Sequence, residues 1–134
     1  MQLISFFEVF TSAEEAPART LNVPQRLGNL PKGRYSFRQC FCVEEAGEPD
    51  TAVIAVYTSK RQKPAALIRV RLTPAVTGSR CYPALEGLQA KYAPTLLYLF
   101  NDMLSQDATY LVQLRDYQAR FQAQQSAQSA PPLR

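Results

Sequence analysis

Three neighbouring segments with the side-chain patterns of β-strands constrain the fold more than any other feature. The first, "RYSFRQCFCV" (34–43), alternates aromatic residues with polar or cationic ones, so one face is aromatic. The second, "TAVIAVYTS" (51–59), is apolar on both faces, as in a central strand, and the third, "AALIRVRLT" (65–73), alternates aliphatic residues with arginines. Because the connections "EEAGEPD" and "KRQKP" are short, the segments are predicted to form an antiparallel meander.

The remainder of the chain after the third segment has helical signals. Pro83 suits the first position of a short helix, "PALEGLQAKY", and Pro94 that of a stronger one. Beyond Pro94 the apolar residues recur every 3.5 positions, with Asp107 as the exception. Either one helix spans about 93–125, or it breaks and Asp107 caps the second part. This spacing is typical of a coiled-coil seam and also of an amphipathic helix packed on a sheet.

The flanking segments complete a single predicted domain, residues 1–125, of the α+β class. Residues 2–11 fit a helix or a strand, and their aromatic and β-branched content favours a strand. Prolines and glycines in 12–33 predict a loop or arm, and the low-complexity residues 126–134 predict a disordered tail. The expected architecture is a three- or four-stranded antiparallel meander with one or more C-terminal helices packed on one face.

The absence of histidine excludes many kinds of active site. Without an imidazole the chain has no Ser-His or Cys-His nucleophile pair and no common mixed zinc site. Cys40 and Cys42 would share one strand face, so the three cysteines are predicted to be thiols, mostly buried, rather than disulfides. We therefore expect a protein that is not an enzyme and has neither a metal nor a cofactor.

The apolar runs are all shorter than the roughly 18 residues that a membrane-spanning helix needs. The N-terminal "MQLISFFEVF" also lacks the cationic start of a secretory signal. Together with the thiols, these features predict a cytoplasmic protein without membrane contacts.

Positive charge is concentrated in the central part of the sequence. Between Thr51 and Leu85 there are six cations and no carboxylate. Strand alternation places Arg69 and Arg71 opposite the aliphatic face, where arginines of segment 34–43 can join them. Like charges on adjacent strands repel, so this surface should attract an anion. The candidate phosphate-binding residues are Arg34, Arg38, Lys60, Arg61, Lys63, Arg69 and Arg71.

Other interpretations of these cations remain open. One interpretation is a solvated face whose arginines pair with the acidic turn, and another is a surface that binds an acidic protein. Binding of a single strand of DNA or RNA also needs exposed aromatic rings for base stacking. Tyr57 is well placed beside the basic turn, whereas Tyr35 becomes available only if the aromatic face of the sheet is uncovered.

Two functions follow from the sequence. The first is a small non-catalytic nucleic-acid-binding or nucleoprotein-accessory protein that contacts phosphates through a basic sheet face. The second is a protein-interaction or adaptor module, either a monomer or a homodimer, that docks on a larger complex through this face or through its C-terminal helix. The candidate interface on that helix consists of Tyr110, Leu114, Tyr117 and Phe121.

Overall fold

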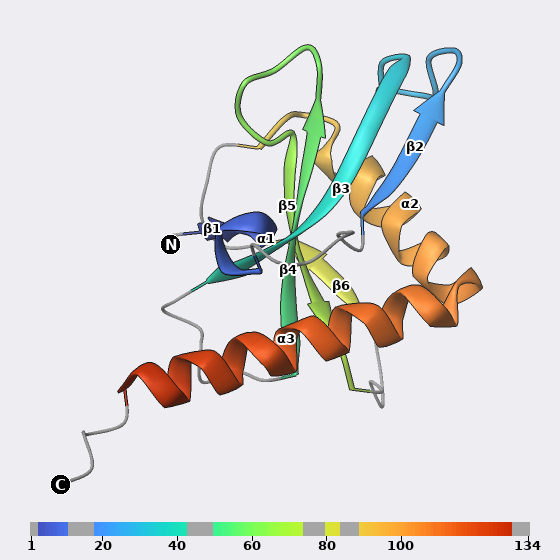
Figure 1. The fold of residues 1–134 in the computed structure, drawn as a ribbon. Coiled ribbons are helices and arrows are strands. Elements are labelled where there is room, and N and C mark those ends of the chain that lie inside the picture. The colour runs from blue at the N-terminus through green and yellow to red at the C-terminus, as the bar shows by residue number, and fades with distance from the viewer. Residues whose placement is uncertain (1–2, 11–17, 43–49, 74–79, 84–88, 130–134) are drawn as a thin grey trace, which may run out of the picture.

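The structure, a computed structural model, describes residues 3–10, 18–42, 50–73, 80–83 and 89–129. These residues form a six-stranded antiparallel sheet and helices that pack beside it (Figure 1). The strands are β1 (Leu3–Ser5), β2 (Arg19–Val23), β3 (Gly33–Cys42), β4 (Thr51–Thr58), β5 (Ala66–Arg71) and β6 (Cys81–Pro83). The helices are α1 (Phe6–Val9), α2 (Ala93–Gln106) and α3 (Ala108–Ser129). The predicted α+β class is confirmed.

The meander at the centre of the sheet is also confirmed. Strands β3, β4, β5 and β6 are hydrogen-bonded in this order, and each pairs antiparallel with the next. Strand β4 is buried along nearly its whole length, which explains why its sequence is apolar on both faces. The sheet is wider than the three or four strands expected, because β1, β2 and β6 are short strands whose pairing partners lie elsewhere in the chain.

The edge of the sheet beside β3 is interrupted. Strand β1 pairs Ser5 with Cys40, whereas β2 pairs Arg19 with Phe37. The two short strands therefore pair with the same edge of β3. Between them the chain leaves this edge, and the segment that leaves it begins with α1. Among the described residues no strand pairs with the intervening Arg38 on this side.

This edge corrects two predictions. Of the described residues in segment 2–11, only Leu3–Ser5 form a strand, and helix α1 follows it at once. In segment 12–33, expected to be a loop or arm, β2 forms where Pro17 and Pro24 leave a stretch of six residues between them. A five-residue edge strand fits in this stretch because its pairing with β3 does not require a donor from either proline.

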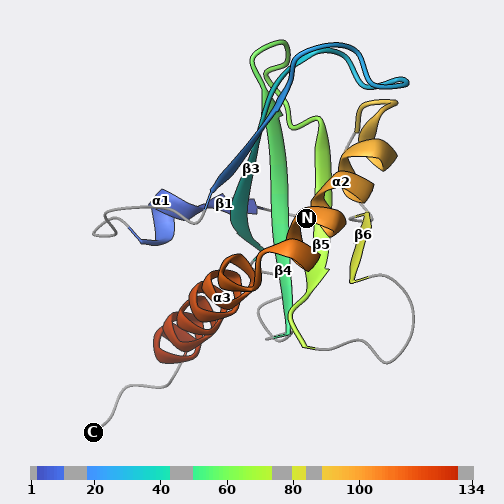
Figure 2. The same ribbon diagram turned by 90° about the vertical axis from the view of Figure 1, so that its right-hand side faces the viewer.

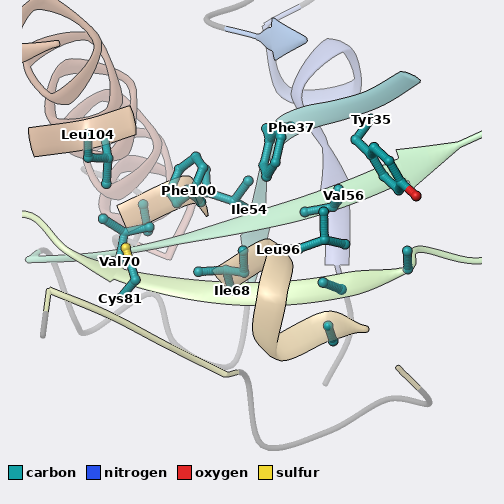
Figure 3. Packing of buried hydrophobic residues seen from close by; sticks show 14 of the residues in the cluster. Tyr35, Phe37, Ile54, Val56, Ile68, Val70, Cys81, Leu96, Phe100 and Leu104 are labelled. Carbon is teal, nitrogen blue, oxygen red and sulfur yellow. The ribbon is translucent and has the colours of Figure 1, made fainter. Parts of the chain in front are cut away.

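The main core lies between the sheet and helices α2 and α3, on a side that we call the helix face (Figures 2 and 3). Helix α2 packs on β5 and β6, and α3 packs on β3 and β4. The rings of Phe37 and Phe100 stack with their centroids 5.2 Å apart, and those of Phe41 and Phe121 at 4.8 Å. The buried amide of Gln39 donates from Nε2 to the Leu114 carbonyl at 3.1 Å, which ties β3 to α3. Alternation along the strands therefore places one set of side chains against the helices, as predicted.

The long helical segment breaks at Asp107, in agreement with one of the two alternatives. Asp107 Oδ1 accepts a hydrogen bond from the Tyr110 backbone N–H at 3.1 Å, which is the contact of an N-cap residue. Asp107 Oδ2 also lies 3.3 Å from a guanidinium nitrogen of Arg19 in β2. The break lets α3 turn away from the direction of α2 and cross β3 and β4 (Figure 1).

Other predicted boundaries differ from the structure. Pro83 ends strand β6 instead of beginning a helix, and residues 84–88 of the expected helix lie outside the described part of the chain. Helix α2 begins at Ala93, with Pro94 in its first turn. Helix α3 continues to Ser129, past the expected start of the tail at residue 126, and residues 130–134 lie outside the description.

Candidate nucleic-acid interface

Four arginines lie on the side of the sheet opposite the helix face, which we call the arginine face. Arg34 and Arg38 alternate in β3 with the buried Tyr35 and Phe37 of the helix face. In β5, Arg69 pairs with Val53 and Arg71 pairs with Thr51. The side chains of Val53 and Thr51 point away from the helix face, on which the core residues of β4 lie. Because paired residues of a sheet point to the same side, Arg34, Arg38, Arg69 and Arg71 share one face.

The four arginines are spread along a diagonal of this face. Arg38 and Arg69 are two strands and two residues apart, so their Cα atoms are separated by about 12 Å. Arg34 and Arg71, at opposite ends, are about 30 Å apart by the same spacing. The arrangement is a line of charges and not a single cluster, and it suits an extended ligand better than a small one.

Two of these arginines lie over tyrosine rings. The guanidinium carbon of Arg38 is 5.0 Å from the ring centroid of Tyr57, and that of Arg71 is 5.1 Å from that of Tyr82. Cation–π contact holds a guanidinium in place without neutralising its charge. Tyr82 was missed by sequence reasoning, because it follows a segment with no strand pattern and precedes a proline that suggested a helix.

The turn that carries Lys60, Arg61 and Lys63 adjoins one end of the arginine face. Lys60 Nζ donates to the Lys32 carbonyl at 2.9 Å, so the β2–β3 connection lies beside the β4–β5 connection (Figure 1). Lys32 therefore lies among the cations at this end of the arginine face. No spacing of residues in the sequence had indicated this position of Lys32. Lys32, Lys60 and Lys63 are exposed and Arg61 is half-buried.

A hollow of about 560 Å³ lies on this end of the arginine face, and we call it the basic hollow. Its described lining combines two guanidinium groups, three hydroxyl-bearing residues and one phenol ring: Arg34, Ser36, Arg38, Tyr57, Thr58 and Ser59. Arg38 Nε donates to Ser36 Oγ at 3.1 Å, which orients the guanidinium along the strand. Guanidinium and hydroxyl donors are the groups that bind phosphate oxygens.

A second hollow of about 470 Å³ adjoins the first at the interruption of the sheet edge, and we call it the aromatic hollow. The two hollows have Ser36, Arg38 and Tyr57 in common. Phe6 and Phe7 of α1 also line the aromatic hollow, and the ring of Phe6 is buried against Phe41 and Tyr117. Phe7 is 55% exposed, and its ring meets that of Phe6 edge-on at 5.4 Å between centroids.

The charges of Arg34 and Arg38 are not neutralised by any carboxylate in the described part of the chain. The two ion pairs between described residues are Arg19 with Asp107 and Arg120 with Asp116, and both involve α3 or its cap. The sequence between residues 16 and 43, which contains β2 and β3, has five cations and no acidic residue. This end of the molecule is therefore strongly positive at neutral pH.

The centre of the arginine face is apolar and buried. Cys40, Ala55 and Leu67 form a small cluster there, against which Leu3 and Tyr57 pack. Burial raises the pKa of the Cys40 thiol to about 11, and the nearby Arg38 lowers it by less. Burial likewise raises the pKa of Cys81 to about 12. Both thiols are neutral at physiological pH and are therefore poor nucleophiles.

No group of three cysteine, aspartate or glutamate side chains within the described ranges is close enough to hold a metal ion. All three cysteines are buried thiols, as predicted. The described residues of the arginine face offer hydrogen bonding, charge and ring stacking.

Tyr35, one of the two predicted stacking residues, lies on the helix face. It is 1% exposed, and its hydroxyl donates to the Pro31 carbonyl at 2.7 Å. Its ring packs edge-on against Tyr92, which lies just before α2. Of the two candidates only Tyr57 borders the arginine face.

The predicted interface on the C-terminal helix faces inward. Tyr110, Leu114 and Phe121 are each 0% exposed and pack on the sheet. Tyr117 is half-buried, with its ring 4.7 Å from that of Phe6 between centroids. The seam is therefore the core side of an amphipathic helix, which was the second interpretation of its spacing.

Comparisons of the chain with protein-family models, with curated proteins and with solved structures found no match. Within the described ranges, none of the helices combines the length and the apolar character that crossing a bilayer requires.

Proposed function

We propose that this protein is a small non-catalytic nucleic-acid-binding or nucleoprotein-accessory protein that contacts phosphates through the arginine face. The main support is the pairing register, which gathers Arg34, Arg38, Arg69 and Arg71 on one side of the sheet. Lys60, Arg61 and Lys63 extend the same positive surface at its end. A linear polyanion matches a line of cations about 30 Å long.

The types of donor support phosphate as the group that is bound. Arginine binds two oxygens of a phosphate at once, and its charge persists at every physiological pH. Ser36 and Ser59 add neutral donors beside Arg34 and Arg38 in the basic hollow. Tyr57 and Tyr82 supply rings on the same face, which a purely electrostatic surface would not need.

The three buried thiols support a reducing compartment such as the cytoplasm. Nucleic acid and ribonucleoprotein complexes are the abundant polyanions there. An adaptor that docks an acidic protein on the same arginines is the alternative, and the experiment below separates the two.

Binding of a fluorescein-labelled single-stranded oligonucleotide of about 16 nucleotides, measured by fluorescence anisotropy, tests the proposal. With four phosphate contacts, the association constant should fall about 50-fold between about 50 mM and about 200 mM salt, because each contact releases condensed counterions. The double variant Arg34→Glu/Arg38→Glu should bind much more weakly. For this variant the slope of log K against log salt should be shallower by about 1.4, as expected for the loss of two contacts.

Arg115→Glu is the matched control, because Arg115 is an exposed arginine on α3, away from the arginine face. It changes the net charge by two units at one site and should leave the affinity within about threefold of the wild type. Equal losses from Arg115→Glu and from a single Arg38→Glu would refute a specific surface. If a polyglutamate peptide binds through Arg34 and Arg38 and the oligonucleotide does not, the partner is an acidic protein.

A further inference from the structure

The aromatic hollow lies where the edge of the sheet is interrupted, next to the basic hollow. Its aromatic lining residues come from two distant parts of the chain, Phe6 and Phe7 from α1 and Tyr57 from the end of β4. This juxtaposition exists because β1 and β2 both pair with β3 and leave the position of Arg38 open between them. The hollow is thus a consequence of the split edge strand.

The size and lining of the aromatic hollow suit a planar aromatic group. At about 470 Å³ it is within the range of small-molecule sites, and its aromatic walls are accompanied by a few polar groups. Phe7 has more than half of its surface exposed, although burial of an aromatic ring is favourable. An exposed ring beside Tyr57 and Arg38 offers a stacking surface for a nucleobase.

The two hollows adjoin, so one nucleotide and its neighbouring phosphate can lie across both. A base in the aromatic hollow would have its backbone beside Ser36 and Arg38, which both hollows share. The next phosphate would then face Arg34, four residues earlier in β3. Ser59 lines the same part of the basic hollow.

We propose that the aromatic hollow binds one unstacked base of a single-stranded nucleic acid, with the adjoining phosphates in the basic hollow. This inference rests on the proposed function and names its substrate class. A base within a duplex is stacked and paired, so it cannot enter the hollow without being extruded. The protein should therefore prefer a single strand to a duplex of the same sequence.

Substitution of Phe7 tests the stacking directly. In the anisotropy assay, Phe7→Ala should weaken binding of a single strand by about fivefold or more, with the slope of log K against log salt unchanged because phosphate contacts remain. Tyr98→Ala is the control, since Tyr98 is 71% exposed on α2 and lines neither hollow. It should bind like the wild type.

A tryptophan probe supplies a second measurement that does not depend on affinity. The chain has no tryptophan, so the Phe7→Trp variant contains a single one. Its emission should be quenched on addition of oligothymidylate or oligouridylate, and the stronger of these two ligands identifies DNA or RNA. An abasic strand of equal length has the same phosphates without bases, and it should bind more weakly and cause no quenching.

The outcomes separate the two proposals. Equal affinity for the abasic strand, the duplex and the full single strand, with no effect of Phe7→Ala, would overturn base insertion and leave phosphate binding by the arginine face intact. The absence of binding to every strand would overturn both. Quenching by the base-bearing strands alone, together with a loss of affinity in Phe7→Ala, supports both.

Discussion

At the level of single residues, Asp107 connects the edge of the sheet to the start of α3. Its Oδ1 caps the helix at the Tyr110 backbone N–H, and its Oδ2 pairs with Arg19. The Arg19 guanidinium also lies over the buried Tyr110 ring, 4.3 Å from the centroid. Burial raises the pKa of Tyr110, so the phenol remains protonated beside the Asp107 carboxylate. One aspartate thus stabilises a helix start and a cation–π contact together.

Asp107→Ala should lower the free energy of unfolding by about 1–2 kcal/mol, through loss of the N-cap and of a partly exposed ion pair. Asp107→Asn should cost less than half of this, because asparagine caps as well as aspartate and only the ion pair is lost. Urea denaturation followed by circular dichroism measures both values. Equal losses in the two variants would mean that charge, and not capping, is the dominant contribution.

At the level of elements, α3 is an amphipathic helix whose apolar side is fully used within the chain. Leu114 is 0% exposed in the main core, and Phe121 stacks on Phe41 of β3. The opposite side is exposed, and Val112 on it is 60% exposed. The seam that suggested a docking surface is therefore needed to hold the helix on the sheet.

Leu114→Asp should destabilise the fold by about 3 kcal/mol or more, because it removes a core side chain and buries an unpaired charge. Val112→Asp places the same charge two residues earlier on the same helix and should change stability by less than about 0.5 kcal/mol. Thermal unfolding followed by circular dichroism compares the two. If Leu114→Asp melts like the wild type, the inward packing of α3 is wrong.

At the level of the whole molecule, the exposed large apolar side chains of the described residues are dispersed. Phe7, Leu27, Tyr98 and Val112 belong to α1, the β2–β3 connection, α2 and α3, respectively. Stable dimers usually bury a contiguous apolar patch, and these residues come from four separate elements. The main asymmetry of the surface is its charge, with cations on β3, β5 and the turn after β4.

We therefore expect a monomer of 15.0 kDa in sedimentation velocity, at all concentrations at which the protein is soluble. Addition of a single-stranded oligonucleotide should increase the sedimentation coefficient without forming a protein dimer. A concentration-dependent dimer in the absence of nucleic acid would favour the adaptor alternative, and Val112→Asp or Tyr98→Ala would then locate its surface.

Much of this fold follows from the strand period of two residues. Alternation in 34–43 and 65–73 is a local property, so it correctly predicted the antiparallel meander and the face on which Arg34, Arg38, Arg69 and Arg71 lie. The sequence also predicted, as one of two alternatives, a helix break capped by Asp107, because a helix cap depends on residues that are close in sequence.

Only the tertiary structure decided which surfaces remain open and which rings meet the arginines. The short strands β1, β2 and β6 are stabilised by pairing with β3 or β5, which their own sequences do not reveal. Phe7 and Tyr57 line the same hollow across the split edge, and the Arg71 guanidinium lies over the ring of Tyr82 in β6. Local sequence determined the direction of each side chain in the central strands, whereas contacts between residues far apart in the chain determined the two hollows and the burial of the α3 seam.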